Sequence, residues 1–341
     1  MPQINMNNPH NMWTDRNQTL IYQTQWFDKF LTVFDRSTGA LVTNVLVGNA
    51  PAHVMTRVDT DQLHVTLNGE PSSSSVVELT PLTANIVRSI NIREGFPHAH
   101  WMSHAGKWMV TPNAATDDST LYNFFSNSVQ SLLPVGHNPI GTSMLPDDTK
   151  YYVTSLLDST ITVIDTNRQV VLGTINLLAN YNPISGQISG PLGALPVQTP
   201  VSPTGKVIVT ANILTDTITL TSTAGTVGTL VAGLPCEPGC HGVQFGAKKG
   251  GGYYAFVSAQ YSNVLLVVDP DPNNDGNVAD AAIVGRVLLT ATPKTQVDDT
   301  ITGNAGMGGQ GVIAIPVVYN GWVQNLPAKW KAMLTPSQQN P

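Results

Sequence analysis

The sequence feature that most limits the possible folds is the segment 139–172, in which four short stretches of strand-forming residues alternate with turn residues. The stretches Ile140–Leu145, Lys150–Ser155, Thr160–Asp165 and Gln169–Leu172 are each predicted to form a β-strand. Most of their apolar residues are β-branched or aromatic, which favours strands, and the turn residues recur too often for a helix. Four short strands joined by tight turns are typical of one blade of a β-propeller.

The same pattern recurs along the chain at intervals of about 43 to 45 residues, the length that four strands and their turns require. The start of each second strand defines the repeat. Counting ten residues back from that point gives one equivalent position in the first strand of each unit. In the sixth unit the count is two residues longer, because the turn between the two strands is enlarged. These register positions are residues 10, 53, 98, 141, 197 and 241. One interval is longer and contains a loop rich in Asn, Gly and Pro, Asn180–Gly193.

We therefore predict an all-β protein in which residues 1–341 form a single β-propeller domain. Seven blades of four antiparallel strands are expected, near 10–48, 51–95, 97–136, 139–180, 195–234, 241–305 and 308–341. The seventh unit begins near Gln310 and is too short for four strands, so the last blade is expected to be incomplete. Either borrowed strands close the ring, or a missing chain segment or a subunit completes the last blade.

Composition argues against several classes of function. Only 11% of the residues are charged, against ~25% in a typical globular protein, and the 16 Lys and Arg are scattered. No basic stripe exists, so a nucleic-acid partner is not expected, and no apolar run approaches the ~18 residues of a membrane span. Hydrolase and nucleotide-binding functions lack a motif, because the chain has no GxSxG, HExxH or P-loop, and no GxGxxG after a strand.

Histidine recurs at the register positions of the first strands. Four of these six positions hold His, in a chain with eight His in total, and they are His10, His53, His98 and His241. The first strand of each blade lines the central axis of a propeller, so these four imidazoles are expected to converge there. His100 follows His98 by two residues and shares its face, and His137 is expected at the same mouth of the channel.

Imidazoles that meet on an axis with thioethers nearby suit copper best, and several His without a carboxylate also fit zinc. Met12 and Met55 supply such thioethers, each two residues beyond a register His. Two other interpretations stay open. The His could donate hydrogen bonds to carbonyls of the neighbouring blade around a water-filled channel, or line a pocket for an anion or an organic ligand. Met12, Met55, Met102 and Met144 could equally be packing residues.

Two resemblances add to this interpretation. Tyr151–Thr154 and Ile161–Asp165 resemble the YVTN family of propeller repeats, which implies a seven-bladed propeller. One His per blade on the axis resembles the catalytic domain of nitrous oxide reductase and the copper-containing thiocyanate dehydrogenase, whose His hold a multinuclear copper cluster. Gly141 and Val197 depart from that pattern, since they stand where a full ring would have His.

The resemblance to the copper propellers implies a copper-dependent oxidoreductase that turns over a small molecule, with a small-molecule substrate or a redox partner. The alternative is a non-catalytic YVTN propeller that acts as a binding module or in a surface or envelope assembly. Low charge and a close Cys pair favour a periplasmic or extracellular location, with the export signal not contained in this chain.

The two cysteines lie four residues apart in the segment CEPGCH, and three interpretations compete for Cys236 and Cys240. They form a local disulfide, they ligate copper as thiolates beside His241, or they attach a haem with His241 as its axial ligand. Pro-Gly between the two thiols suits a tight turn, which favours the disulfide.

An acidic loop between the third and fourth strands of the sixth unit alternates oxygen ligands. From Asp271 it reads D-x-N-x-D-G, similar to the first half of a calcium loop of the EF-hand type. The predicted structural calcium ligands are Asp269, Asp271, Asn273, Asp275 and Asp280. The alternative is a solvated acidic hairpin without an ion.

Overall fold

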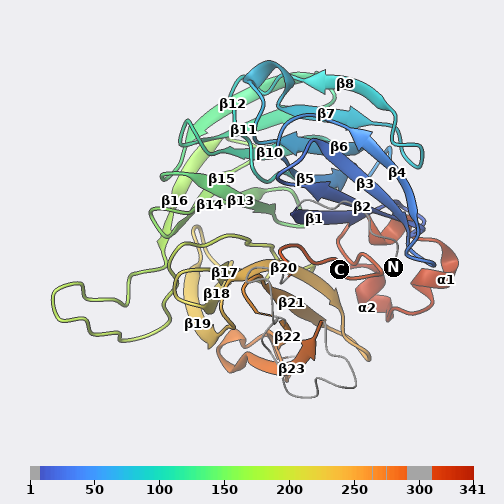
Figure 1. Cartoon of the computed structure of the whole chain (residues 1–341). Coiled ribbons are helices and arrows are strands. Elements are labelled where there is room, and N and C mark those ends of the chain that lie inside the picture. Colours follow the sequence, from blue (N-terminus) through green and yellow to red (C-terminus); the bar gives the residue numbers. More distant parts are fainter. Residues whose placement is uncertain (1–7, 263, 274, 290–308) are drawn as a thin grey trace.

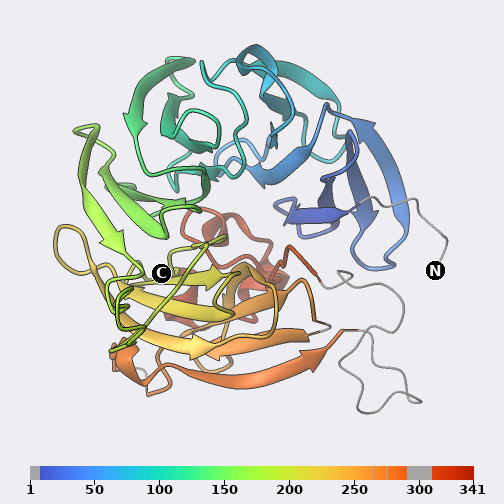
Figure 2. The same ribbon diagram turned by 60° about the vertical axis from the view of Figure 1, so that its left-hand side comes forward.

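The computed structural model describes residues 8–262, 264–273, 275–289 and 309–341. Within them, six antiparallel sheets follow one another around a common axis, so the predicted all-β propeller fold is confirmed. Figures 1 and 2 show the sheets as blades arranged in a ring, and we number them 1 to 6 in chain order.

The strands of the first three blades follow the predicted repeat. Blade 1 contains β1 (Pro9–Thr14), β2 (Leu20–Gln25), β3 (Phe30–Asp35) and β4 (Leu41–Leu46). Blade 2 contains β5 (Pro51–Thr56), β6 (Leu63–Leu67), β7 (Val76–Leu79) and β8 (Ile86–Ile90), with the short helix η1 (Ser72–Ser74) between β6 and β7. Blade 3 contains β9 (Trp101–Met102), β10 (Trp108–Asn113), β11 (Asp118–Asn123) and β12 (Ser128–Pro134).

Blades 4 to 6 continue the ring. Blade 4 contains β13 (Pro139–Met144), β14 (Lys150–Ser155), β15 (Thr160–Asp165) and β16 (Val170–Asn176). Blade 5 has only β17 (Val207–Asn212), β18 (Thr217–Ser222) and β19 (Thr229–Pro235). Blade 6 contains β20 (Cys240–Ala247), β21 (Tyr253–Ala259), β22 (Val264–Asp269) and β23 (Ala282–Leu288), with the short helix η2 (Val278–Asp280) before β23.

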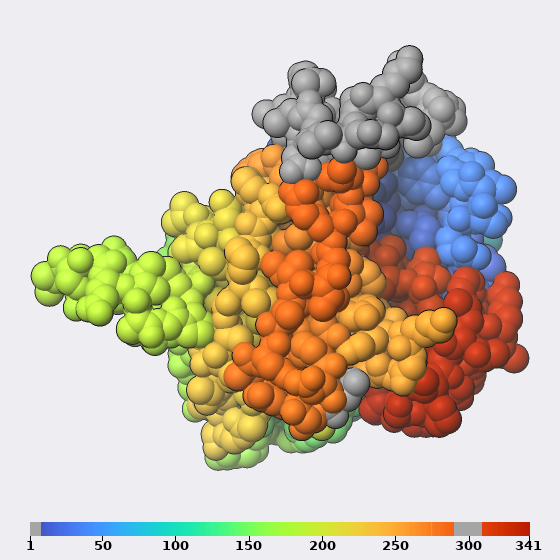
Figure 3. All heavy atoms as spheres, turned by 90° about the horizontal axis from the view of Figure 1, so that it is seen from below, coloured from blue at the N-terminus to red at the C-terminus, as the bar shows by residue number. Residues whose placement is uncertain are grey.

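Proline explains why blade 5 has no continuous first strand. Its inner segment contacts β17 at the isolated bridges Pro196↔Asn212 and Val201↔Ile208 and through a few further backbone hydrogen bonds, without forming a continuous ladder. Pro196, Pro200 and Pro203 lack the N–H that a sheet ladder needs. The longer loop Asn180–Gly193 precedes this segment, and Figures 1 and 3 show it projecting from the ring.

Burial follows the position of each strand in its blade. All six residues of β13 are buried, whereas β4 at the outer edge alternates between exposed and half-buried residues. The adjacent Tyr151 and Tyr152 point to opposite faces of blade 4, and both are fully buried. The core therefore lies between the faces of neighbouring blades.

The predicted seventh blade does not form in the described part of the chain. Residues 309–341 contain no strand, only η3 (Val323–Asn325), α1 (Ala328–Lys331) and α2 (Pro336–Gln339). The propeller therefore has six blades here rather than seven. Residues 290–308, where the sixth predicted blade ends and the seventh begins, lie outside the described residues. No helix in the described ranges is long and apolar enough to cross a lipid bilayer.

The C-terminal segment closes one end of the channel instead of forming a blade. We call residues 317–326 the C-terminal plug. Its buried side chains are those of Val317, Val318, Tyr319, Trp322, Val323 and Leu326. Figure 2 shows this red segment inside the ring of blades.

Hydrogen bonds join the C-terminal plug to five blades. Val317 N–H donates to Gln18 Oε1 in blade 1, and the Tyr319 hydroxyl donates to Gln244 Oε1 in blade 6. Further bonds reach Thr56 in blade 2, His104 in blade 3 and Pro146 in blade 4. The position of the plug at the axis lets its apolar side chains pack against several blades at once, whereas the residues of one blade pack mainly against the two neighbouring blades.

We predict that the C-terminal plug is integral to the fold. Trp322 is buried and its Nε1 donates to the Thr56 carbonyl at 3.2 Å. Trp322→Ala removes this packing and bond, so the free energy of unfolding should fall by about 3–5 kcal/mol, measured by urea denaturation. Met333→Ala, at a side chain that is 66% exposed, is the control and should change it by about 0.5 kcal/mol or less. Equal effects of the two substitutions would contradict the prediction.

Candidate metal centre

The blade topology brings the four register His to one level of the channel. In each blade, the innermost segment begins opposite the end of the second strand of the same blade. The pairs Pro9↔Gln25, Pro51↔Leu67 and Cys240↔Ala259 show this. The bridge Pro97↔Asn113 repeats this in blade 3. Each register His follows within two residues of such a pair. We call His10, His53, His98 and His241 the His cluster.

The four imidazoles of the His cluster are buried and adjacent. The ring centroid of His10 lies 5.6 Å from that of His53, 5.1 Å from that of His98 and 5.4 Å from that of His241. The centroids of His53 and His98 are 5.2 Å apart. The predicted convergence on the axis is therefore observed for all four.

Three of these residues present nitrogen atoms at metal-binding spacing. One ring nitrogen from each of His10, His53 and His98 lies within 4.8 Å of the other two. His10 Nε2 and His98 Nε2 are 3.2 Å apart. Two nitrogens on one tetrahedral ion, each at about 2.0–2.1 Å from it, lie roughly 3.3 Å apart. The spacing thus fits two ligands of a single ion.

Hydrogen bonds on the opposite ring nitrogens fix the tautomers. Nδ1 of His98 donates to the Ile140 carbonyl at 2.9 Å, and Nδ1 of His241 donates to the Gln310 carbonyl at 3.1 Å. Nδ1 of His10 lies 2.8 Å from Gln310 Oε1, which accepts because the amide nitrogen of Gln310 donates to Gln260. A carbonyl oxygen only accepts, so Nδ1 carries the proton and each Nε2 presents a lone pair.

Burial keeps the His cluster neutral at physiological pH. It lowers the pKa of His10 from 6.5 to about 4 and that of His241 from 6.5 to about 3. The pKa values of His53 and His98 lie well below 6.5, through burial first and then through repulsion by neighbouring imidazoles. Neutral imidazole is the form that binds metal ions. With both Nδ1 atoms protonated, the facing Nε2 lone pairs of His10 and His98 repel each other unless a cation lies between them.

Two further residues contact the His cluster, and the sequence interpretation did not assign either of them to the site. The indole of Trp26 lies 4.8 Å from the ring of His10 and 5.3 Å from that of His98. Gln310 bonds His10 through its side chain and His241 through its carbonyl, which links blade 1 to blade 6. The only sequence signal for Gln310 was its place at the start of the predicted seventh unit.

His100 borders a small cavity below the cluster. The cavity holds about 50 Å³ and is also lined by His53, Met12, Met55 and Gln198. His53 Nε2, both ring nitrogens of His100 and Gln198 Nε2 are buried and have no hydrogen-bond partner among the described residues. The polar atoms of the cavity wall therefore suit a small polar ligand.

The methionines divide between the cavity and the core. Met12 and Met55 line the cavity, as expected of thioethers near the His cluster. Met102 and Met144 are buried in the hydrophobic core as packing residues, and Met55 belongs to that core as well as to the cavity wall.

His137 is not brought to the His cluster, contrary to its prediction as a copper ligand. Its side chain is 70% exposed, and its Nδ1 lies 2.9 Å from a carboxylate oxygen of Asp158. The loop between β12 and β13 places the ring beside Asp158 and Asp117, on the surface. These carboxylates raise the pKa of His137, chiefly through the hydrogen bond to Asp158.

The two register positions without His have structural explanations. A Cβ atom at Gly141 would lie 2.4 Å from the carbonyl oxygen of Val197, so close approach of blades 4 and 5 requires glycine there. In blade 5 the neighbouring Gln198 reaches the cavity instead, and its Oε1 accepts from Val243 N–H at 2.9 Å. The ring is therefore limited to four imidazoles.

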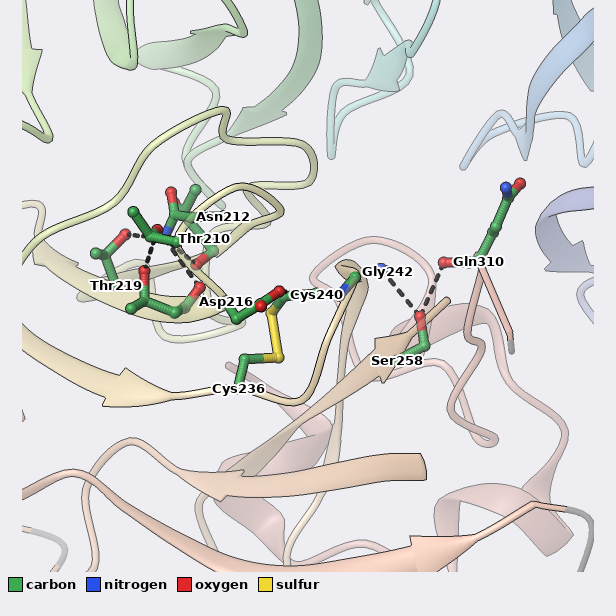
Figure 4. Close-up of a disulfide and its surroundings, with 12 residues drawn as sticks. Thr210, Asn212, Asp216, Thr219, Cys236, Cys240, Gly242, Ser258 and Gln310 are labelled. Carbon is green, nitrogen blue, oxygen red and sulfur yellow. Dashed lines mark hydrogen bonds between the residues drawn. A yellow bond between two sulfur atoms is a disulfide. The ribbon is translucent and has the colours of Figure 1, made fainter. Parts of the chain in front are cut away.

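Cys236 and Cys240 form a disulfide, as the tight-turn interpretation predicted. The bond excludes the alternatives of thiolate ligation and haem attachment, because each sulfur is bonded to the other. Cys240 directly precedes His241 at the start of β20. Figure 4 shows how Ser258 ties this strand to the C-terminal segment, accepting from Gly242 N–H and donating to the Gln310 carbonyl.

The acidic loop brings together three of its five predicted calcium ligands. Carboxylate oxygens of Asp271, Asp275 and Asp280 lie within 4.8 Å of one another. Asn273 donates its side-chain amide to Asp280. Asp269 is directed elsewhere, because its carboxylate is buried and pairs with Lys248 Nζ at 2.5 Å. The prediction that Asp269 is a calcium ligand therefore does not fit this arrangement.

Comparison with known proteins supports the fold. No protein-family model and no curated protein sequence matches the chain. Among solved structures, hydrazine synthase of Kuenenia stuttgartiensis is 13% identical, with a TM-score of 0.66 over 84% of this chain and 88% of that chain. A putative 6-phosphogluconolactonase of Bacteroides uniformis is 15% identical, with a TM-score of 0.64 over 85% of this chain and 88% of that chain.

A functionally unknown protein of Desulfotomaculum acetoxidans is 13% identical, with a TM-score of 0.62 over 81% of this chain and 79% of that chain. At such identities the likeness shows the propeller fold alone. The resemblance to YVTN repeats and to the copper propellers accordingly stays a prediction.

Histidine titration by NMR should separate the buried cluster from the surface. In metal-free protein, His10 should stay neutral until the pH approaches about 4, because burial lowers its pKa. His137 should titrate above 6.5, and Asp158→Asn should return its pKa towards 6.5. Stability linked to His10 is complete above pH 6.5 and is lost as the pH falls towards about 4.

Stability linked to His137 has the opposite sign. It is present below pH 6.5 and is lost as the pH rises through the raised pKa. A His10 signal that titrates at 6.5 would refute the buried, neutral cluster.

Proposed function

We propose that this chain is an extracytoplasmic β-propeller that holds copper on its central axis and turns over a small molecule by redox chemistry. The observation that supports this most is the pair of Nε2 lone pairs of His10 and His98, 3.2 Å apart with both Nδ1 protons engaged elsewhere. His10, His53 and His98 are the proposed ligands, with His241 beside them as a fourth.

Copper is preferred over other ions because of the donor set. Imidazole nitrogen suits copper, nickel and zinc, and the thioethers of Met12 and Met55 in the adjoining cavity favour copper. Bound copper would supply one-electron chemistry, whereas zinc in the same ligand set would supply only a Lewis acid. Metal identity is therefore the first quantity to measure.

The cavity beside His53 and His100 is the proposed substrate site. Its volume of about 50 Å³ admits a molecule of only a few atoms. Gln198 Nε2 is a donor without a partner in the described chain, and the ring nitrogens of His100 offer one donor and one acceptor. These side chains would orient a polar substrate. The C-terminal plug, on the far side of the cavity, excludes water from that end.

A location outside the cytoplasm accompanies this proposal. The Cys236–Cys240 disulfide supports it, because disulfides persist in the periplasm and outside the cell and are rare in reducing compartments. The alternative function is a non-catalytic propeller that acts as a binding or envelope module. Gly141 and Val197 favour it, since they leave the ring without two imidazoles.

Copper binding tests the proposal directly. Protein reconstituted with copper and then desalted should retain about one copper per chain by elemental analysis, in preference to zinc. His53→Ala combined with His98→Ala should abolish this binding. His137→Ala is the matched control, because His137 lies on the surface beside Asp158, and it should retain the metal. Metal-free protein of unchanged stability would favour the binding-module function instead.

Gln310→Leu provides a graded variant for the same assay. It removes the side-chain bond to His10 and keeps the backbone carbonyl that accepts from His241. Loss of such a supporting partner typically weakens metal affinity by about 10–100-fold. Quenching of tryptophan fluorescence by bound copper, with Trp26→Phe to identify the contribution of Trp26, gives the affinity independently of catalysis.

A structural calcium ion at the acidic loop is a separate proposal. Asp271, Asp275 and Asp280 supply carboxylate oxygens at suitable separations. Excess Ca²⁺ should raise the melting temperature by about 2 °C or more, and Asp271→Asn should remove that shift. Asp147→Asn, in a turn of blade 4, should leave the shift intact. Insensitivity to Ca²⁺ would leave the loop as a solvated hairpin.

A further inference from the structure

One turn position carries a large, exposed side chain in four of the six blades. The position lies two residues beyond the end of the second strand, in blades 1, 4, 5 and 6. Its side chains are 62–69% exposed, and they are Phe27 (69%), Leu157 (65%), Leu214 (66%) and Tyr261 (62%). Single exposed apolar residues are ordinary, but an equivalent position repeated around a ring forms a common surface.

This surface surrounds the end of the channel that holds the His cluster. The turn after each second strand adjoins the start of the first segment, where the register His lie. Trp26, next to Phe27, contacts the rings of His10 and His98, and Gln260, next to Tyr261, bonds Gln310. We call this end of the ring the cluster face. The C-terminal plug occupies the opposite end.

The cluster face is acidic. It consists of the turns after the second strands and the loops that lead into the first segments. Their partly exposed carboxylates are those of Asp28, Glu70, Glu94, Asp117, Asp158, Asp216 and Glu237. Among the described residues of these turns and loops, the only Lys or Arg are Lys29 and Arg93. The turns at the opposite end hold charges of both signs. Their cations include Arg16, Arg57, Lys107, Lys206, Lys248 and Lys249, and their carboxylates include Asp15, Asp59, Asp61, Asp147 and Asp148.

Turn formation accounts for part of this pattern and leaves the rest unexplained. Asp117, Asp158 and Asp216 accept backbone N–H groups of the neighbouring loop, so their carboxylates also have a structural role. Those backbone bonds do not neutralise the carboxylates, although His137 lies beside Asp117 and Asp158 and Arg286 pairs with Glu237. Leu157 and Leu214 leave about two thirds of their surface exposed, at 65% and 66%. Exposed apolar side chains that share these turns with carboxylates are suited to a partner that offers both apolar and basic contacts.

We propose that the cluster face docks a small basic redox protein, whose exposed cofactor edge lies in an apolar patch surrounded by lysines. Carboxylates would steer the encounter over long range, and the apolar side chains would form the short-range contact. The role of the partner as an electron carrier rests on the proposed copper function. The docking itself depends only on the surface.

Binding of cytochrome c, whose haem edge is surrounded by lysines, tests the proposal. Titration at low ionic strength should give a saturable complex, and the affinity should fall by about 10-fold or more on moving to physiological salt. The triple variant Leu157→Ser, Leu214→Ser, Tyr261→Ser should weaken binding by about 10-fold or more. Asp28→Asn with Glu94→Gln should slow association and reduce the dependence on salt.

Matched controls are available on the outer strands. Val42, Val87 and Val171 are 53%, 48% and 40% exposed on β4, β8 and β16, away from the cluster face, and their triple change to Ser should not alter binding. The proposal is overturned if cytochrome c does not bind, if binding is insensitive to salt, or if the control variant weakens it as much as the cluster-face variant.

A metal-site variant separates this inference from the proposed function. Protein with His53→Ala and His98→Ala lacks the proposed copper ligands but keeps the turns of the cluster face. It should bind cytochrome c like the unmodified chain, which supports docking even if copper analysis is negative. Docking that disappears in this variant would contradict a binding surface formed by the turns alone.

Discussion

The hydrogen bonds of Gln310 are the interaction on which the closed ring depends. A propeller must join its last blade to its first, and here Gln310 does so at the axis, through its side chain to His10 and its carbonyl to His241. Ser258 donates to the same carbonyl and so ties β21 to this junction. Gln310 therefore links the first and last blades at the axis, in addition to the links that the C-terminal plug makes, and it sets the proton positions of two imidazoles in the His cluster.

That junction has an electrostatic consequence. Four buried imidazoles have little access to water, so charging any of them is unfavourable, and their pKa values fall below 6.5. With Nδ1 protons committed to oxygen acceptors, the cluster concentrates Nε2 lone pairs in a small volume. Neutral imidazoles with free Nε2 lone pairs are the form that binds metal ions, which is the basis of the proposed metal centre.

The two ends of the ring differ in how far they are closed and in the side chains that they expose. Buried apolar residues of the C-terminal plug close one end, with bonds to five blades. The cluster face at the other end is acidic and carries exposed apolar side chains. The proposed docking of a partner would therefore use the side of the molecule opposite the C-terminal plug, although the charged residues are scattered along the sequence.

Local pattern in the sequence was enough to predict the strands, the blade repeat and the level at which four His meet. Strand alternation is short-range, and a repeated register places equivalent residues at equivalent points of each blade. The disulfide was also predictable, because its cysteines are four residues apart. The six-blade count was not, since no local signal shows that residues 309–341 form the C-terminal plug and short helices instead of pairing as a sheet.

The remaining features were decided by contacts between distant parts of the chain. His137 lies on the surface beside Asp158 and Asp117. The Asp269 carboxylate pairs with Lys248 and accepts from Asp271 N–H, rather than joining the other carboxylates of the acidic loop. Gly141 replaces His because the Val197 carbonyl approaches too closely. His10 and Gln310 meet although 300 positions separate them. The sequence by itself determined the repeating blade and its histidines, and only the tertiary structure decided which side chains reach the axis, because closure of the ring sets those contacts.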